Sequence, residues 1–216
     1  VVVTARAVPV MEWIGDLLRA GEHLAEGVAS VTGCGRATVA TSMTIAEYLL
    51  PAWIMALRLR HPGVEVAVST GNTDAVVAAV LADEVQLGFV EGPASPVGVT
   101  ALPFAQDELV LVVPPGHPWA GRDDVTPEEL RATRLVRRVP GSGTRGTLEA
   151  ALPGLAPPLV ELGTTAAVKA AALAGCRATV LSRLAVRNEL DEGRLVAVPV
   201  RGLDLTRSLQ MIRRPD

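Results

Sequence analysis

The sequence has little of what metal centres and histidine-based catalytic sites need. Its 216 residues include only three histidines, His23, His61 and His117, and two cysteines, Cys34 and Cys176. The cysteines are far apart and lack metal-binding or redox spacing, so we expect reduced thiols. His61 and His117 both precede a proline in helix-ending or loop positions, and neither has a carboxylate at a spacing typical of catalytic or metal-binding pairs. We therefore expect no metal site and no cofactor.

Motifs of bond-breaking chemistry are also absent. The sequence contains no GxSxG, HExxH, SxxK or Cys/His arrangement. Glu47 follows one turn into an expected helix, where a solvated or salt-bridged carboxylate is more common than a general base. We therefore predict no catalytic residues and a protein that is not an enzyme.

No long hydrophobic run approaches the roughly 18 residues that span a membrane. Charged residues such as Arg6, Glu12 and Arg19 interrupt the only candidate signal peptide. The net charge of −3 disfavours non-specific nucleic-acid binding by this chain. With 49% hydrophobic and 20% charged residues, the composition is globular. We expect a cytoplasmic protein with one large domain or two small ones.

The stretch from Ala37 to Val68 reads as a strand, a helix and a second strand. A hydroxyl-rich turn with Ser42 and Thr44 opens a helix that we expect over 45–59. In α/β sheets such turns lie at the carboxyl edge of the strands, where free backbone N–H groups bind ligands. The alternative is that Ser42 and Thr44 only cap the helix.

The same alternation continues to the end of the chain. It predicts two strands over 99–104 and 108–113, joined by a connection at 105–107. The other expected elements are strands at 86–90, 135–139, 159–162, 178–181, 195–200 and 205–212, and helices at 74–83, 126–131, 145–152, 165–174 and 183–190.

Five polar turns recur in this pattern, four of them opening helices and the fifth, 91–93, following a strand. One group comprises 41–44, 72–74 and 91–93, and the other comprises 141–145 and 163–165. The Gly-rich turn Pro140–Gly146 lacks the order and the lysine of a nucleotide P-loop. It could cradle an oxyanion with Arg145 as a charge partner, or be an ordinary capped turn. Two lobes facing across a cleft would bring both groups together.

Residues 1–30 differ from the rest and predict an amphipathic helix, followed by a hinge-like linker at 31–35. This helix either packs on its own domain or connects to, and pairs with, a partner chain.

In combination, these motifs resemble the effector-binding regulatory domain of LysR-type transcriptional regulators. The likeness covers about Arg36 to Asp216, and 1–30 look like the end of that family's linker helix. The version with PGSGTR and TIAEYLLP is similar to the branch that regulates sulfur assimilation and carbon fixation. The matching stretches are TSMTIAEYLLPAW, RHPGVEV, GNTD, QLGFVEGP, ALPFAQDELVLVVPPGHPWA, PGSGTR, ELGTTAAVKAAALAG, VLSRLAV and GRLVAVPV.

The resemblance implies a type 2 periplasmic-binding-protein fold, an α/β fold of two Rossmann-like lobes. Lobe I would comprise 36–105 plus 194–216, and lobe II 106–193, after the linker helix and hinge at 1–35. The family's DNA-binding winged helix-turn-helix would precede Val1, and the protein would form a homodimer or tetramer.

The resemblance also implies an effector cleft for a small carboxylate, phosphate or sulfur oxyanion. The rival classes are a transporter's solute-binding protein and a two-lobed enzyme such as a dehydratase or deaminase. The effector-binding residues that we predict are Ser42, Met43, Thr44, Asn72, Thr73, Glu91, Gly92, Pro93, Ser142, Gly143, Thr144, Arg145, Thr164 and Thr165.

Overall fold

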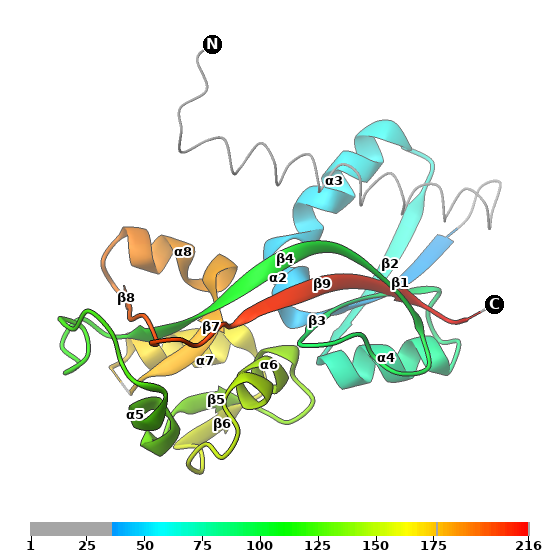
Figure 1. Ribbon diagram of the computed structural model, residues 1–216. Helices are drawn as coiled ribbons and strands as arrows, with labels where there is room; N and C mark the ends of the chain where they lie inside the picture. Colours follow the sequence, from blue (N-terminus) through cyan, green and yellow to red (C-terminus); the bar gives the residue numbers. More distant parts are fainter. Residues whose placement is uncertain (1–35, 176, 216) are drawn as a thin grey trace.

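Helices and strands alternate along the chain in the computed structural model, which describes residues 36–175 and 177–215 (Figure 1). The linker helix and hinge expected at 1–35, and both cysteines, lie outside these residues. The strands are β1 (Arg36–Ser42), β2 (Glu65–Gly71), β3 (Leu87–Gly92), β4 (Thr100–Val113), β5 (Val136–Arg138), β6 (Val160–Leu162), β7 (Thr179–Ser182), β8 (Val196–Ala197) and β9 (Thr206–Arg213). The helices are α2 (Met43–Tyr48), α3 (Leu50–Arg60), α4 (Thr73–Leu81), α5 (Pro127–Ala132), α6 (Gly143–Ala151), α7 (Thr165–Leu173) and α8 (Arg183–Asp191).

The strands form two lobes that share the long strands β4 and β9. Their order is β2-β1-β3-β9-β4-β7-β5-β6, and β8 pairs with β4. We call β1–β3, α2–α4 and the adjoining parts of β4 and β9 lobe I, and β5–β8 with α5–α8 and the end of β4 lobe II. Figure 1 shows β4 and β9 side by side across the middle of the molecule, between the two lobes. The expected α/β fold of two lobes is therefore present.

Strand alternation places a core on each face of both lobes. In lobe I, Val39 packs under α3 and its neighbour Ala40 packs on α4. In lobe II, Leu111 packs with α5 and α6, and Val112 packs with α7 and α8. Each helix therefore covers the sheet face that the period-two pattern of the strand makes apolar.

The expectation of two strands over 99–104 and 108–113 is wrong, because β4 is continuous. Residues 105–108 pair in antiparallel register with 206–209 of β9, so no turn separates the two halves. The register shifts between Pro103 and Ala105. Proline has no backbone N–H to donate, which explains an irregularity at this point.

The helix expected over 45–59 is also interrupted. Leu49 separates α2 from α3, and Pro51 occupies the first turn of α3. A proline ring collides with the carbonyl four residues earlier, so α2 cannot continue through it. The break therefore divides the expected helix into two.

The segment between α8 and β9 contacts lobe II. Val196 and Ala197 pair with the end of β4, and Val198 and Leu205 belong to the lobe II core. The lobe boundaries predicted from the sequence, 36–105 with 194–216 and 106–193, stay a prediction.

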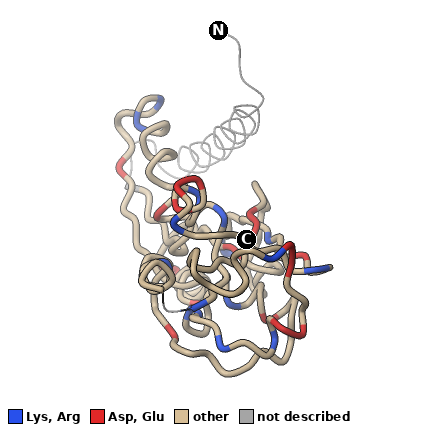
Figure 2. The backbone as a smooth tube through the Cα atoms, turned by 90° about the vertical axis from the view of Figure 1, so that its left-hand side faces the viewer, with Lys and Arg blue, Asp and Glu red and all other residues tan. Residues whose placement is uncertain are grey.

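Basic and acidic residues are interspersed along the backbone in the view of Figure 2. Within the described ranges no helix is long and apolar enough to cross a membrane.

Candidate functional site

The polar turns that open the helices meet where the two lobes face each other. The backbone N–H of Gly143, at the start of α6, donates to Thr73 Oγ1 at the start of α4, at 3.1 Å. The N–H of Asp74 donates to the carbonyl oxygen of Gly141 at 3.2 Å. A Cβ added to Gly143 would overlap the backbone oxygen of Glu91. Only glycine lets α6 approach β3 this closely.

Arg207 of β9 lies at the centre of this contact, and its side chain is fully buried. Its Nη2 is 2.7 Å from Asp107 Oδ2, on the neighbouring strand β4. Its Nη1 donates to Thr144 Oγ1 of α6 at 3.1 Å, and its Nη2 donates to Thr44 Oγ1 of α2 at 3.3 Å. One guanidinium therefore holds lobe I, lobe II and the connecting strands together.

Glu91 supplies a second buried carboxylate beside Arg207. It is 2% exposed, and its Oε1 lies 3.5 Å from Arg207 Nη1. Its Oε2 accepts from Ser42 Oγ, directly before α2. The carboxylate of Glu91 thus occupies a position where a guanidinium and a helix-start hydroxyl converge, as a bound anion would.

Arg138 of β5 is a second buried cation, in lobe II. It donates to Thr165 Oγ1 at 2.8 Å and to the carbonyl oxygen of Gly163 at 2.9 Å. Its Nε has no partner within the described residues. Burial lowers the pKa of Arg138, against the nearby carboxylate of Glu91, which raises it. The site therefore retains one unused donor on a buried cation.

A crevice of about 630 Å³ opens from this interface to solvent. Its walls are α4, the segment after β3 and the start of α6. Seven predicted residues line it: Thr73, Glu91, Gly92, Pro93, Ser142, Gly143 and Arg145. Residues of the turns at 72–74, 91–93 and 141–145 thus line one hollow, whereas the turns at 41–44 and 163–165 do not line it.

The remaining predicted residues do not line the crevice. Ser42, Thr44 and Thr144 are buried behind the crevice, around Arg207. Met43 is half-buried. Glu91 and Gly92, expected in a turn, belong to β3 and pair with β9.

Two predicted residues act as helix caps. Asn72 Oδ1 accepts from Ala75 N–H at 2.8 Å, and Asn72 Nδ2 also donates to the carbonyl of Pro140 across the interface. Thr164 Oγ1 accepts from Ala167 N–H at the start of α7. Thr164 thus caps α7, whereas Asn72 caps its helix and also joins the lobes.

Arg145 lies on the lobe II wall and pairs with acidic residues of its own lobe. It contacts Glu161, and its Nε lies 2.8 Å from Glu149 Oε1. Burial opposes the charge on Arg145, but these two carboxylates outweigh it and raise its pKa. An incoming anion would have to compete with both carboxylates for this side chain.

Sequence reasoning missed Arg207, Asp107, Arg138 and Ser182, whose Oγ donates to Asp107 Oδ1 at 2.8 Å. A signal for Arg207 was present. Arg207 lies two residues from both Leu205 and Leu209 in the expected strand. The period of two therefore places all three side chains on the same, buried face. A charge on such a face needs partners and marks a candidate site.

The hydroxyls, helix-start amides and guanidinium groups of this interface are suited to holding an oxyanion. Within the described residues, no group of three or more His, Cys, Asp or Glu could hold a metal ion.

Comparison with known proteins identifies the family. Residues 32–216 match the family described as the LysR substrate binding domain. The chain belongs to the LysR family. It is an effector-binding regulatory domain of a LysR-type transcriptional regulator, and this family consists of regulators rather than enzymes. The two rival classes, a solute-binding protein and an enzyme, are thereby set aside.

Curated relatives are similar over most of the chain. The uncharacterized HTH-type transcriptional regulator Mb2303c of Mycobacterium bovis is 42% identical over 97% of this chain and 72% of its own length. CysL of Bacillus subtilis is 32% identical over 84% of this chain and 62% of its own. The RuBisCO operon transcriptional regulator of Acidithiobacillus ferrooxidans is 31% identical over 89% of this chain and 63% of its own length.

The LysR domain fold also matches solved structures. The regulatory domain of CcmR from Synechocystis, in complex with 2-PG, superimposes with a TM-score of 0.74 and 24% identity. The match covers 83% of this chain and 88% of that one. This similarity supports the periplasmic-binding-protein-like fold of the two lobes.

Proposed function

We propose that this LysR domain senses a small oxyanion metabolite between its lobes, at the interface around Arg207. The observation that carries the proposal is the buried Arg207 cluster, in which a tethered carboxylate, Glu91, already occupies an anion position. The effector would be a carboxylate, a phosphate or a sulfur oxyanion.

The donors for such an anion come from both lobes. Ser42 supplies a hydroxyl from lobe I, and Ser142 and the start of α6 supply a hydroxyl and amides from lobe II. Each charge-assisted contact contributes about 1.5–3 kcal/mol. A ligand that bridges both lobes binds one lobe arrangement more strongly than another, which is the condition for shifting their equilibrium.

An incoming anion would exchange with the Glu91 carboxylate. Two negative groups cannot share one set of donors without repulsion, so Glu91 must swing out as the effector enters. Glu91 would then set the affinity of the site, because the free-energy cost of displacing its carboxylate reduces the binding free energy of every anion.

Two comparisons support this choice of ligand class. CcmR, which shares the fold, is described in complex with 2-PG, a phosphate-bearing carboxylate. The likeness to CysL and to a RuBisCO operon regulator supports membership of the branch that regulates sulfur assimilation and carbon fixation.

In the whole regulator, this domain would act as a homodimer or higher assembly in the cytoplasm, and DNA would be bound by a winged helix-turn-helix before Val1. The exposed apolar residues Met55 and Leu59 on α3 support a dimer contact, because they lie one turn apart on one helix face. Apolar side chains exposed together favour burial against another protein surface.

Calorimetric titration with inorganic sulfate, inorganic phosphate and 2-phosphoglycolate tests the proposed site. We expect Glu91→Gln to bind at least one of them about tenfold more tightly than the wild type, which corresponds to about 1.4 kcal/mol. Ser42→Ala should bind the same anion more weakly, because it loses a donor.

Ser95→Ala serves as the control, since Ser95 is exposed in the loop after β3. It should match the wild type. Equal affinity in all four proteins, or saturable binding by none of them, would contradict an oxyanion site at Glu91.

A further inference from the structure

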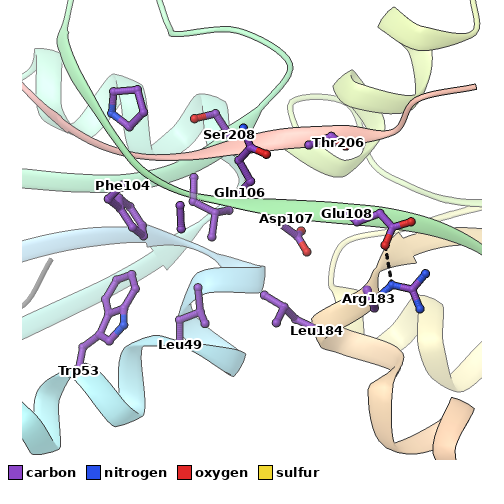
Figure 3. Close-up of a pocket in the computed structure, with 13 residues that line it drawn as sticks. Leu49, Trp53, Phe104, Gln106, Asp107, Glu108, Arg183, Leu184, Thr206 and Ser208 are labelled. Carbon is purple, nitrogen blue, oxygen red and sulfur yellow. Dashed lines mark hydrogen bonds and ion pairs between the residues drawn. The ribbon is translucent and has the colours of Figure 1, made fainter. Parts of the chain in front are cut away.

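A second hollow lies beside the connecting strands, away from the crevice at α6. Its volume is about 670 Å³, within the range of small-molecule sites. Lobe I contributes Leu49, Trp53 and Phe104, and lobe II contributes Arg183 and Leu184 (Figure 3). We call it the hinge pocket. Its walls belong to both lobes, as do the walls of the crevice, but its lining residues are different.

The hinge pocket and the Arg207 cluster have almost no residues in common. Along β9, Thr206, Ser208 and Leu209 line the hinge pocket, whereas Arg207 does not line it and binds Asp107 in the cluster. Only Asp107 belongs to both, because it lines the pocket and binds Arg207. The hinge pocket is therefore a distinct cavity and not part of the proposed oxyanion site.

The aromatic wall of the hinge pocket contains an unused hydrogen-bond donor. Trp53 is 3% exposed, and its indole Nε1 has no hydrogen-bond partner within the described residues. The indole packs on Phe104 with ring centroids 5.3 Å apart, and Figure 3 draws both rings on the side of the pocket opposite Arg183. A buried N–H without an acceptor is costly, so an acceptor from a bound molecule would be favourable.

The charged residues of the hinge pocket are already paired. Arg183 Nε lies 2.6 Å from Glu108 Oε2, and Asp107 is paired with Arg207. Neither pair leaves an uncompensated charge toward the pocket. An ionic ligand would lose its hydration without gaining a counter-ion, whereas an uncharged ligand would not.

We propose that the hinge pocket binds a small uncharged aromatic molecule that carries one hydrogen-bond acceptor. Its ring packs between Trp53, Phe104, Leu49 and Leu184, and its acceptor receives the indole N–H of Trp53. The inference goes beyond oxyanion sensing and does not depend on it, because the two sites differ in position and in charge.

Nuclear magnetic resonance of the ¹⁵N-labelled 216-residue chain tests this with three probes of one shape: benzamide, benzoate and benzamidine. We expect benzamide to shift the Trp53 indole N–H resonance downfield in a saturable manner. The anionic and cationic probes should bind at least about fivefold more weakly, because each leaves its charge unpaired.

Two variants locate the probe. Trp53→Phe keeps an aromatic ring but removes the donor, and it should weaken benzamide binding about fivefold. Gln106→Trp fills the pocket from an exposed position on β4 and should abolish binding. Trp119→Phe, in the loop after β4, is the matched control and should leave affinity unchanged.

The proposal is overturned if benzamide leaves the Trp53 indole resonance in place, or if all three charge forms bind equally. It is also overturned if Gln106→Trp binds benzamide as well as the wild type does, since this result does not depend on how Trp53→Phe folds.

Discussion

At the scale of single residues, Arg207 dominates the structure. A fully buried guanidinium is stable only when its charge and its donors are matched. Here Asp107 and Glu91 supply the charge, and the hydroxyls of Thr44 and Thr144 accept from the remaining donors. This one side chain therefore makes closure of the lobes and burial of two carboxylates interdependent.

Replacing Arg207 should unfold the protein far more easily. We expect Arg207→Met to lower the free energy of unfolding by about 3–5 kcal/mol, because Asp107 and Glu91 would stay buried without a cation. Chemical denaturation measures this change. Arg201→Met is the control, since Arg201 forms an exposed ion pair with Asp124 and should not shift the midpoint measurably. Similar losses in both variants would contradict a special role for Arg207.

At the scale of the element, α5 shows how a short helix is stabilised by its first turn. Thr126 Oγ1 accepts from Glu129 N–H at 3.2 Å, and Glu129 Oε2 accepts from Thr126 N–H at 2.9 Å. Glu129 also pairs with Arg122 at 2.7 Å. The hydrogen bond from Arg122, followed by that from the Thr126 backbone, lowers the pKa of Glu129 from 4.5 to about 2.

This lowered pKa predicts the pH dependence of the α5 contribution. A carboxyl whose pKa is lower in the folded state stabilises above its unfolded pKa of 4.5, and this stabilisation is lost as the pH falls toward 2. We expect Glu129→Gln to lower the melting temperature at pH 7 but to differ less from the wild type at pH 3. A difference that grows as the pH falls would show that the sign is wrong.

At the scale of the whole molecule, the contact between the lobes depends on Gly143. A Cβ there would overlap the Glu91 backbone oxygen. We expect Gly143→Ala to push α6 away from β3, to lower stability by about 1–3 kcal/mol, and to speed hydrogen exchange at the Asp74 amide. Gly163→Ala is the control, because nothing lies within 4 Å of its added Cβ. Unchanged exchange at Asp74 in Gly143→Ala would mean that the lobes are held together elsewhere.

The same scale includes the proposed dimer. Met55 and Leu59 on α3 are 61% and 82% exposed. We expect the double variant Met55→Glu, Leu59→Glu to sediment as a monomer at concentrations where the wild type is a dimer. Val97→Glu alters an equally exposed apolar residue, 92% exposed, outside α3, and it should leave the dimer intact. A wild type that stays monomeric at high concentration would rule out the contact.

Much of the fold followed from local patterns. Alternation of apolar residues predicted most strands, and polar turns predicted where α4, α5 and α7 begin, because capping depends on residues within one turn. The same patterns failed at Leu49 and at 105–107. Near Leu49, Pro51 interrupted the expected helix. At 105–107, pairing with the distant strand β9 kept β4 continuous.

By itself, the sequence determined the α/β alternation and the polar turns at which helices begin, since both depend on neighbours a few positions apart. Tertiary structure alone decided which charges meet there. Arg207 binds Asp107 across 100 positions and Thr44 across 163. Partners so distant are selected by the pairing of β4 with β9 and the approach of α6 to β3. No local pattern encodes them, because a buried charge takes its partner from whichever segment the fold brings within reach.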